Sequence, residues 1–288
     1  MDSSFTINAG GTSLSDEVNP LVYVVVRNRN QAADLRRLVR ALELQTRRSG
    51  LVLVDNDSTD DSIDVARAYG ARIVNISRED FSFGRAINVG VEAAPAEFIV
   101  LLSSHSLPLS STFIEDCLRP FSDPDVAATK CLRLDNSERW MDLRTISGPI
   151  GWDIPLWDLP ENNGCVFRKS VWRKFPFDES VEAAEDKLWS YQLLNGGFKI
   201  AESSALYKYC HEDRFWASLR RFTRVQVSLY RMRGMGMNPY PPRLVFREFF
   251  RTIPRQALKS AAYLALRCLV FQTVPWRARR KSKLGSVR

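Results

Sequence analysis

Residues 51–62 read LVLVDNDSTDDS, and this stretch decides the fold class of the chain. The apolar run from Leu51 to Val54 changes abruptly into acids, an amide and hydroxyls, and a helical pattern resumes at Ile63. Such a change is typical of the carboxyl end of a buried parallel strand, where open α/β sheets bind their ligands. The stretch therefore predicts a strand, a loop and a helix, with a ligand site in the loop.

Much of the polarity in this loop has a structural use. Ser58 or Thr59 can cap the next helix, and the acids that follow suit its first turn. Asp55 and Asn56 precede any cap and lie at the strand tip. A carboxylate and an amide there are suited to the base and ribose of a nucleotide.

The same pattern recurs through the first half of the chain. Residues 21–26 form an apolar run that ends in Arg27-Asn28-Arg29-Asn30, and residues 98–102 form another that ends in Ser103. Apolar spacing predicts helices over residues 33–46 and 84–94, and a short strand over 72–75. Strands that alternate with helices across short connections predict an α/β fold with a mostly parallel sheet flanked by helices.

Composition agrees with an enzyme-sized protein of a reducing compartment. The chain has 288 residues, of which 45% are hydrophobic, enough for one sizeable core. Its five scattered cysteines include no Cys-x-x-Cys pair, which argues against a disulfide framework and a zinc module. Residues 1–19 are polar and lack the pattern of a signal peptide, so we expect a disordered tail.

Charge divides the chain near residue 213. Residues 214–288 carry 18 Lys and Arg against a single acid, Glu248, whereas the rest of the chain has more acids than bases. We therefore expect a catalytic domain over residues 20–213 and a basic helical C-terminal region over 214–288. The basic region must meet something anionic, whether lipid, nucleic acid or the acidic domain itself.

An acidic pair opens a predicted helix in the second half of the chain. Glu185 and Asp186 precede apolar residues at helical spacing, and Gly196-Gly197 ends that segment. The pair could simply complement the helix dipole, which is worth about 0.3–1 kcal/mol. It could also supply a general base, because backbone N–H groups would hold one carboxylate in its ionised form.

In their order and spacing, these segments resemble the family 2 glycosyltransferases with the GT-A fold, and most closely the rhamnosyltransferase-like members of polysaccharide biosynthesis. The resemblance spans about residues 20–222. It implies transfer of a sugar, rhamnosyl or hexosyl, from a nucleoside diphosphate donor to an acceptor hydroxyl with inversion at the anomeric carbon. The segments that carry it are VRNRN (26–30), VDNDSTD (54–60), FSFGRAINVG (81–90), residues 98–108 and AEDK (184–187).

The resemblance also implies roles for individual residues. Asp186 matches the family's catalytic base, and Glu185 is its neighbour. Without the resemblance, Arg85 could equally be an ordinary solvated or salt-bridged arginine. The positions that match the nucleotide-sugar site are Arg27, Asn28, Asn30, Asp55, Asn56, Arg85, Asn88, Ser103 and His105.

The chain departs from the family at the metal motif. The family usually carries Asp-x-Asp, which binds Mg²⁺ or Mn²⁺, where this chain reads Ser103-Ser104-His105. Mg²⁺ prefers oxygen ligands, and imidazole suits later transition metals better. His105 could be a metal ligand, a direct diphosphate contact or a turn residue, and His211 could be a second ligand or a surface histidine. We therefore expect weak or relaxed dependence on Mn²⁺ or Mg²⁺.

Other functional classes fit less well. A dinucleotide oxidoreductase would carry Gly-x-Gly-x-x-Gly after the first strand, and a P-loop kinase would carry Gly-Lys-Ser/Thr; neither pattern occurs there. The main alternative is a non-catalytic pseudo-glycosyltransferase, or a nucleic-acid-binding protein that uses the basic region. Because Glu185 and Asp186 are retained, we favour an enzyme and expect no nucleic-acid partner.

The basic region predicts a membrane partner. Residues 260–276 are too short and too polar to span a bilayer. Residues 243–253 have the pattern of an interfacial helix, and the cationic cluster at 277–283 suits acidic head groups. The alternative is that this helix packs on the catalytic domain. We expect a peripheral protein on the cytoplasmic face of the cytoplasmic membrane, with a saccharide or lipid-linked acceptor.

Overall fold

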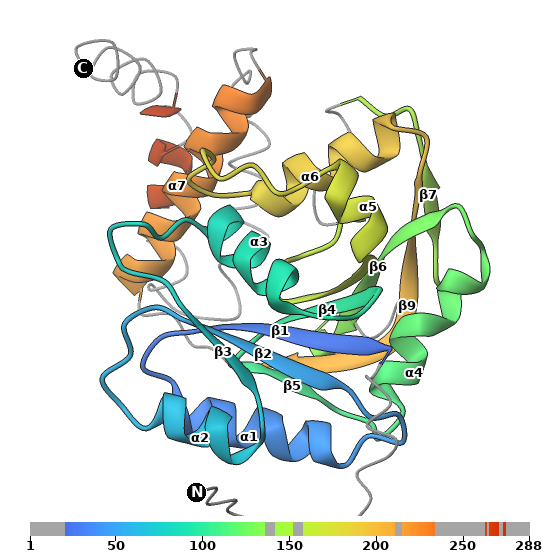
Figure 1. Ribbon diagram of the computed structural model, residues 1–288. Helices are drawn as coiled ribbons and strands as arrows, with labels where there is room; N and C mark the ends of the chain where they lie inside the picture. Colours follow the sequence, from blue (N-terminus) through green and yellow to red (C-terminus); the bar gives the residue numbers. More distant parts are fainter. Residues whose placement is uncertain are drawn as a thin grey trace, which may run out of the picture.

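The computed structural model describes residues 21–135, 142–151, 158–210 and 215–233, with residues 263, 265–270, 273 and 274. Within them, nine strands form one sheet in the order β3-β2-β1-β4-β8-β6-β9-β5, and β7 pairs with β9 (Figure 1). The strands are β1 (Val22–Asn28), β2 (Gly50–Asp55), β3 (Arg72–Asn75), β4 (Phe98–Ser103), β5 (Ser106–Pro108), β6 (Val126–Arg133), β7 (Thr145–Ser147), β8 (Gly164–Arg168) and β9 (Lys199–Tyr209).

The expected parallel sheet is confirmed for the first half of the chain. Strands β3, β2, β1 and β4 are neighbours and run parallel, as predicted from alternating strands and helices. The second half adds β8 antiparallel to β4, and β6 antiparallel to β8. This change of direction brings the start of β8 to the edge where β4 ends, since Leu102 pairs with Gly164.

Helices cover both faces of the sheet (Figure 1). Helices α1, α2 and α4 supply buried side chains to one face, and α3, α5 and α6 supply them to the other. The helices are α1 (Ala32–Glu43), α2 (Ser62–Ala68), α3 (Phe83–Ala93), α4 (Phe113–Leu118), the 3-10 turn η1 (Arg119–Ser122), α5 (Lys169–Lys174), α6 (Glu185–Asn195) and α7 (Phe215–Arg233).

Two of the predicted helices, α1 and α3, begin within one residue of the expected positions, but the predicted cap of α2 is wrong. Asp61 is the N-cap of α2, and its side chain makes no capping bond. Ser58 instead accepts from the backbone N–H of Asn30 at 2.9 Å. Its hydroxyl therefore joins the loops that follow β1 and β2.

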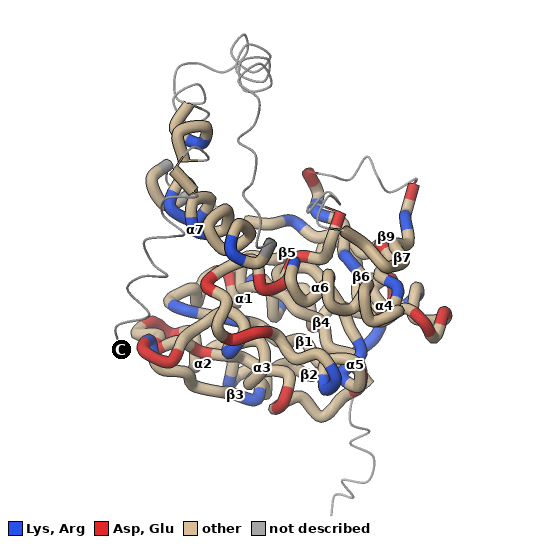
Figure 2. Tube along the Cα trace, turned by 90° about the horizontal axis from the view of Figure 1, so that it is seen from above, with Lys and Arg blue, Asp and Glu red and all other residues tan. Residues whose placement is uncertain are grey.

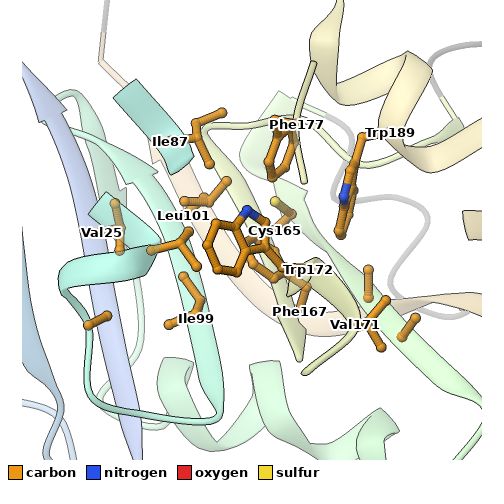
Figure 3. Packing of buried hydrophobic residues seen from close by; sticks show 14 of the residues in the cluster. Val25, Ile87, Ile99, Leu101, Cys165, Phe167, Val171, Trp172, Phe177 and Trp189 are labelled. Carbon is orange, nitrogen blue, oxygen red and sulfur yellow. The ribbon is translucent and has the colours of Figure 1, made fainter. Parts of the chain in front are cut away.

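Aromatic packing fixes the position of α6. Trp189 is 1% exposed and stacks on Phe177, with ring centroids 4.7 Å apart (Figure 3). Its indole N–H donates to the carbonyl of Phe175 at 2.6 Å. Because Trp189 lies one turn after Glu185, this contact holds the first turn of α6 against the sheet.

Within the described residues, no helix has both the length and the apolar character that crossing a membrane requires.

Candidate functional site

The carboxyl ends of β1, β2 and β4 bring together the polar residues predicted from the sequence. Asn28 pairs with Asp55 in register, and Arg27 pairs with Ser103. The side-chain N–H of Asn28 donates to Asp55 Oδ1 at 3.2 Å, and its side-chain oxygen Oδ1 accepts from the Ser104 hydroxyl at 2.8 Å. Asn28 and Asp55 are 4% and 1% exposed. These two side chains therefore tie the three strand tips together from below.

The loops above this layer hold Asn30 and Asn56. Asn30 has a left-handed backbone with φ of 52°, and its side-chain oxygen accepts from the Thr59 N–H at 2.7 Å. Asn56 is 7% exposed, and its Oδ1 has no hydrogen-bond partner among the described residues. A buried acceptor without a partner costs about 1–3 kcal/mol, so Asn56 offers an acceptor to a ligand at the tip of β2.

Asn162 joins the strand tips to the acidic pair. Arg27 Nη2 donates to Asn162 Oδ1 at 2.8 Å and to its backbone oxygen at 3.1 Å. The amide group of Asn162 donates to Glu185 Oε1, and its backbone N–H donates to Asp186 Oδ2 at 3.2 Å. One loop residue therefore holds an arginine and both carboxylates in a single cluster.

The loop that carries Asn162 is itself held by α6. Lys187 Nζ donates to the carbonyls of Leu159 and Pro160 at 3.1 and 2.9 Å. Ala184, directly before the acidic pair, has a left-handed backbone with φ of 64°. That conformation costs a non-glycine residue about 1–2 kcal/mol, and such strain concentrates at functional sites.

The two acids differ in their surroundings. Glu185 is 2% exposed, and burial, followed by the negative charge of Asp186, raises its pKa from 4.5 to about 7. Asp186 is only partly buried, and its Oδ1 accepts from the Lys187 N–H at 2.8 Å. Backbone donors thus fix both oxygens of Asp186, while Glu185 carries its proton up to neutral pH.

One nitrogen of the Arg27 guanidinium makes no hydrogen bond within the described residues. Its Nη1 is buried and has no partner among the described residues, although Nη2 is bonded to Asn162. The guanidinium carbon lies 5.3 Å from the centroid of the Phe83 ring, at the start of α3. This nitrogen is a donor available to an anionic ligand.

The predicted donor-binding residues on α3 have partners within the protein. Arg85 pairs with Glu179 at 3.6 Å, and both side chains are more than 40% exposed. The amide of Asn88 donates to the Phe177 carbonyl and to Glu179, and its oxygen accepts from Trp172 and from the Phe177 N–H. Asn88 therefore fixes the loop before α6, and a contact with the donor would require it to exchange a protein partner.

The serines and histidine at the metal-motif position are engaged within the protein. Ser103 Oγ lies 3.1 Å from Ser106 Oγ, and His105 Nδ1 lies 3.2 Å from Asp34 Oδ2 on α1. Among the described residues, no group of three or more His, Cys, Asp or Glu side chains could hold a metal ion. His211 lies outside the described residues. The described residues at this strand tip therefore show no metal site.

Asn162 was not predicted as a site residue, because the prediction rested on polar residues that follow strands. Asn162 and Asn163 precede a strand, β8. Since β8 runs antiparallel to β4, its beginning shares the edge where the parallel strands end. The signal was the pair of asparagines before Gly164, a position equivalent in space to a strand tip.

Comparison with known proteins gives a family and a fold. Residues 22–176 match the family model described as glycosyl transferase family 2. The O-antigen chain rhamnosyltransferase WbaN of Salmonella anatum is 25% identical over 228 residues. The alignment covers 74% of this chain and 64% of that relative, so the chain spans less than two thirds of the relative's length.

Solved structures share the fold. A mannosyltransferase from Pyrobaculum calidifontis, in complex with GDP-Man and Mn²⁺, has a TM-score of 0.58 at 15% identity and covers 91% of this chain and 73% of its own. Glucosyl-3-phosphoglycerate synthase from Mycobacterium tuberculosis has a TM-score of 0.55 at 18% identity, over 77% and 83% of the two chains. The expected GT-A fold is confirmed.

The raised pKa of Glu185 makes a prediction about stability. Folding raises this pKa above its ordinary 4.5. The protonated carboxyl therefore contributes fully to the stability of the fold below pH 4.5, and this contribution is lost as pH rises through about 7. Glu185→Gln keeps an acceptor for Asn162 but does not ionise. We expect the free energy of unfolding of the wild type to fall relative to that of the variant as pH rises from 5 to 7, by at most about 1.4 kcal/mol per pH unit.

Urea unfolding of both proteins at pH 5, 6, 7 and 8 measures this difference. Glu92→Gln, an exposed acid on α3, is the control and should show no such trend. A wild-type-to-Glu185→Gln difference that stays constant across this range would contradict the assignment.

Proposed function

We propose, because the chain belongs to glycosyl transferase family 2, that it moves a sugar from a nucleoside diphosphate donor to an acceptor hydroxyl with inversion at the anomeric carbon. The observation that carries this proposal is the cluster of Arg27, Asn162, Glu185 and Asp186 at the strand tips. It sets a cation with an open donor beside a fixed carboxylate, and sugar transfer needs both.

Asp186 is the proposed general base. As the acceptor oxygen forms a bond to the anomeric carbon, its proton passes to the Asp186 carboxylate, and the bond to the nucleoside diphosphate breaks. Hydrogen bonds from the N–H groups of Asn162 and Lys187 orient both carboxylate oxygens. Glu185, the buried neighbour of Asp186 in sequence, adds no second charge next to the base when it is protonated.

The donor is proposed to lie over the tips of β1, β2 and β4. Asp55 and Asn56 would face the base and ribose, and the open Oδ1 of Asn56 supports that placement. Arg27 would face the diphosphate, which gains negative charge as it leaves, and fixed cations there would lower the barrier. The other proposed donor-site residues are Asn28, Asn30, Arg85, Asn88, Ser103 and His105.

The proposed reaction is the transfer of a rhamnosyl or hexosyl group in the synthesis of cell-surface polysaccharide or glycolipid. The support is the named activity of the Salmonella relative, an O-antigen chain rhamnosyltransferase. The proposed acceptor is a saccharide or a lipid-linked saccharide. A non-catalytic or nucleic-acid-binding role is not favoured, because the family match covers the strands that carry Arg27, Asp55 and Ser103.

Asp186→Asn tests the reaction directly. The amide cannot accept a proton but keeps the size of the side chain, so we expect transfer to fall about a hundredfold or more while donor binding stays intact. The measurement is turnover with a panel of nucleotide sugars, alongside calorimetric donor binding. Asp64→Asn changes an exposed acid on α2 and should leave both unchanged. Near-normal turnover in Asp186→Asn would move the role of base elsewhere.

The metal-motif position makes a second prediction. Its hydroxyl and imidazole groups are poor ligands for Mg²⁺, so we expect activity to fall only a few-fold when EDTA replaces Mg²⁺ or Mn²⁺. We expect His105→Ala to raise the donor concentration required and to slow transfer, with little loss of stability. Strict Mg²⁺ dependence that is unchanged in both His105→Ala and His211→Ala would place the ligands elsewhere.

We propose that the basic C-terminal region docks the protein on the cytoplasmic face of a membrane, where a lipid-linked acceptor would lie. The predicted interfacial helix at 243–253 and the cationic cluster at 277–283 lie outside the described residues. Val270 and Val274 pack with Val227 of α7, so removing the region would expose an apolar surface. Charge substitution in the full chain is therefore the cleaner test.

Replacing the five cations of residues 277–283 with Gln should weaken co-sedimentation with vesicles rich in anionic lipid by about tenfold or more at low salt, since each charge near the surface is worth about 1 kcal/mol. Vesicles of neutral lipid are the control. Equal partitioning of the wild-type and substituted chains on anionic vesicles would remove the membrane proposal.

A further inference from the structure

Helix α7 is the first helix of the basic region, and it lies against the candidate site. Arg231 on this helix pairs with Glu182 at 3.5 Å, in the loop directly before Ala184 and the acidic pair. Arg224, two turns earlier, lies with its guanidinium carbon 5.9 Å from the centroid of the Phe83 ring. Both contacts are to segments that border the cluster around Asn162. The charge boundary near residue 213 is therefore not a boundary of the site.

Two guanidinium groups from distant parts of the chain share one aromatic ring. Arg27 lies 5.3 Å and Arg224 lies 5.9 Å from the centroid of Phe83. The two guanidinium carbons are thus no further apart than the sum of these distances. An anion that lies beside the Phe83 ring would therefore be within reach of both guanidinium groups.

No ion pair joins either arginine to a carboxylate of the described residues, although the charge of Arg27 acts on Glu185 and opposes the rise in that acid's pKa. Arg27 is bonded to the amide oxygen and backbone oxygen of Asn162, and its Nη1 has no partner there. Arg224 is exposed, and no acidic side chain within the described part of the chain pairs with it. Arg231 of the same helix, in contrast, has a carboxylate partner in Glu182. Arginines recur along this helix (Figure 2).

The proposed reaction needs positive charge at this place. A leaving nucleoside diphosphate gains negative charge in the transition state, and fixed cations stabilise it. Ser103, Ser104 and His105, at the tip of β4, include no carboxylate. Arginine presents a planar set of donors that matches phosphate oxygens in pairs.

We infer that Arg224 of α7 is a catalytic residue that contacts the diphosphate of the donor together with Arg27. This inference rests on the proposed function and adds a wall to its site: α7 closes the donor site from the side of Phe83. The basic C-terminal region then has two parts. Helix α7 serves the donor, and only the residues after it remain for a membrane surface.

Binding of nucleoside diphosphates to the full chain tests the inference. The probes are UDP, GDP and thymidine diphosphate, each compared with its own nucleoside. We expect Arg224→Ala to weaken binding of the preferred diphosphate by about tenfold to a hundredfold, the usual scale for lost charge-assisted hydrogen bonds. Binding of the nucleoside should change less than twofold. Arg224→Lys keeps the charge without the planar donors and should fall between Arg224→Ala and the wild type.

Arg220→Ala is the matched control, because it removes the same charge from an exposed position one turn earlier on α7. It should bind both probes within twofold of the wild type. Thermal unfolding of each variant separates loss of binding from loss of fold. An unchanged diphosphate affinity in a folded Arg224→Ala protein would overturn the inference, and so would an equal loss for the nucleoside. If the wild type itself binds no diphosphate and transfers no sugar, the proposed function fails instead.

Discussion

The site depends on one buried carboxyl group having a partner. Glu185 is 2% exposed, and taking an acid out of water is costly unless it is hydrogen-bonded or protonated. The amide of Asn162 supplies the bond, and its oxygen and backbone are then free to engage Arg27 and Asp186. Because the loop of Asn162 is in turn held by Lys187 of the same helix, the acidic pair and its partner position each other. The packing of Trp189 on Phe177 holds that helix against the sheet.

The sequence was sufficient where the signal is local. Strand tips and helical spacing predicted β1, β2, β3, β4, α1 and α3, and the register of the parallel strands then brings Asn28, Asp55 and Ser103 together. Signals that depend on long-range pairing were missed. Asn162 reaches the strand tips because β8 is antiparallel to β4, and Arg224 lies near Phe83 because α7 packs beside the start of α3. The residues next to Asn162 and Arg224 indicate neither the direction of β8 nor the packing of α7.

Two side chains that the local sequence singles out are engaged by other segments of the protein. Ser58 has the composition of a helix cap, but its hydroxyl is taken by the N–H of Asn30, since two loops meet at the strand tips and each brings unpaired backbone donors. Asn88 has the position of a donor contact in the family pattern, and yet its amide is shared among Phe177, Glu179 and Trp172. In both cases the side chain bonds to a segment that is distant in the sequence. The residues around Ser58 and Asn88 give no sign of these partners.

The site separates groups that the fold has satisfied from groups that it has left open. Asn28, Asp55 and Asn162 are bonded on several sides and set the geometry. Arg27 Nη1 and Asn56 Oδ1, in contrast, are buried without partners among the described residues, at an expected cost of about 1–3 kcal/mol each. A folded protein tolerates this cost where the missing partner arrives with a ligand. One of these groups is a donor at the end of β1, and the other is an acceptor directly after the neighbouring strand β2. This pairing fits a ligand with an anionic part and a hydrogen-bonding part, as a nucleoside diphosphate has.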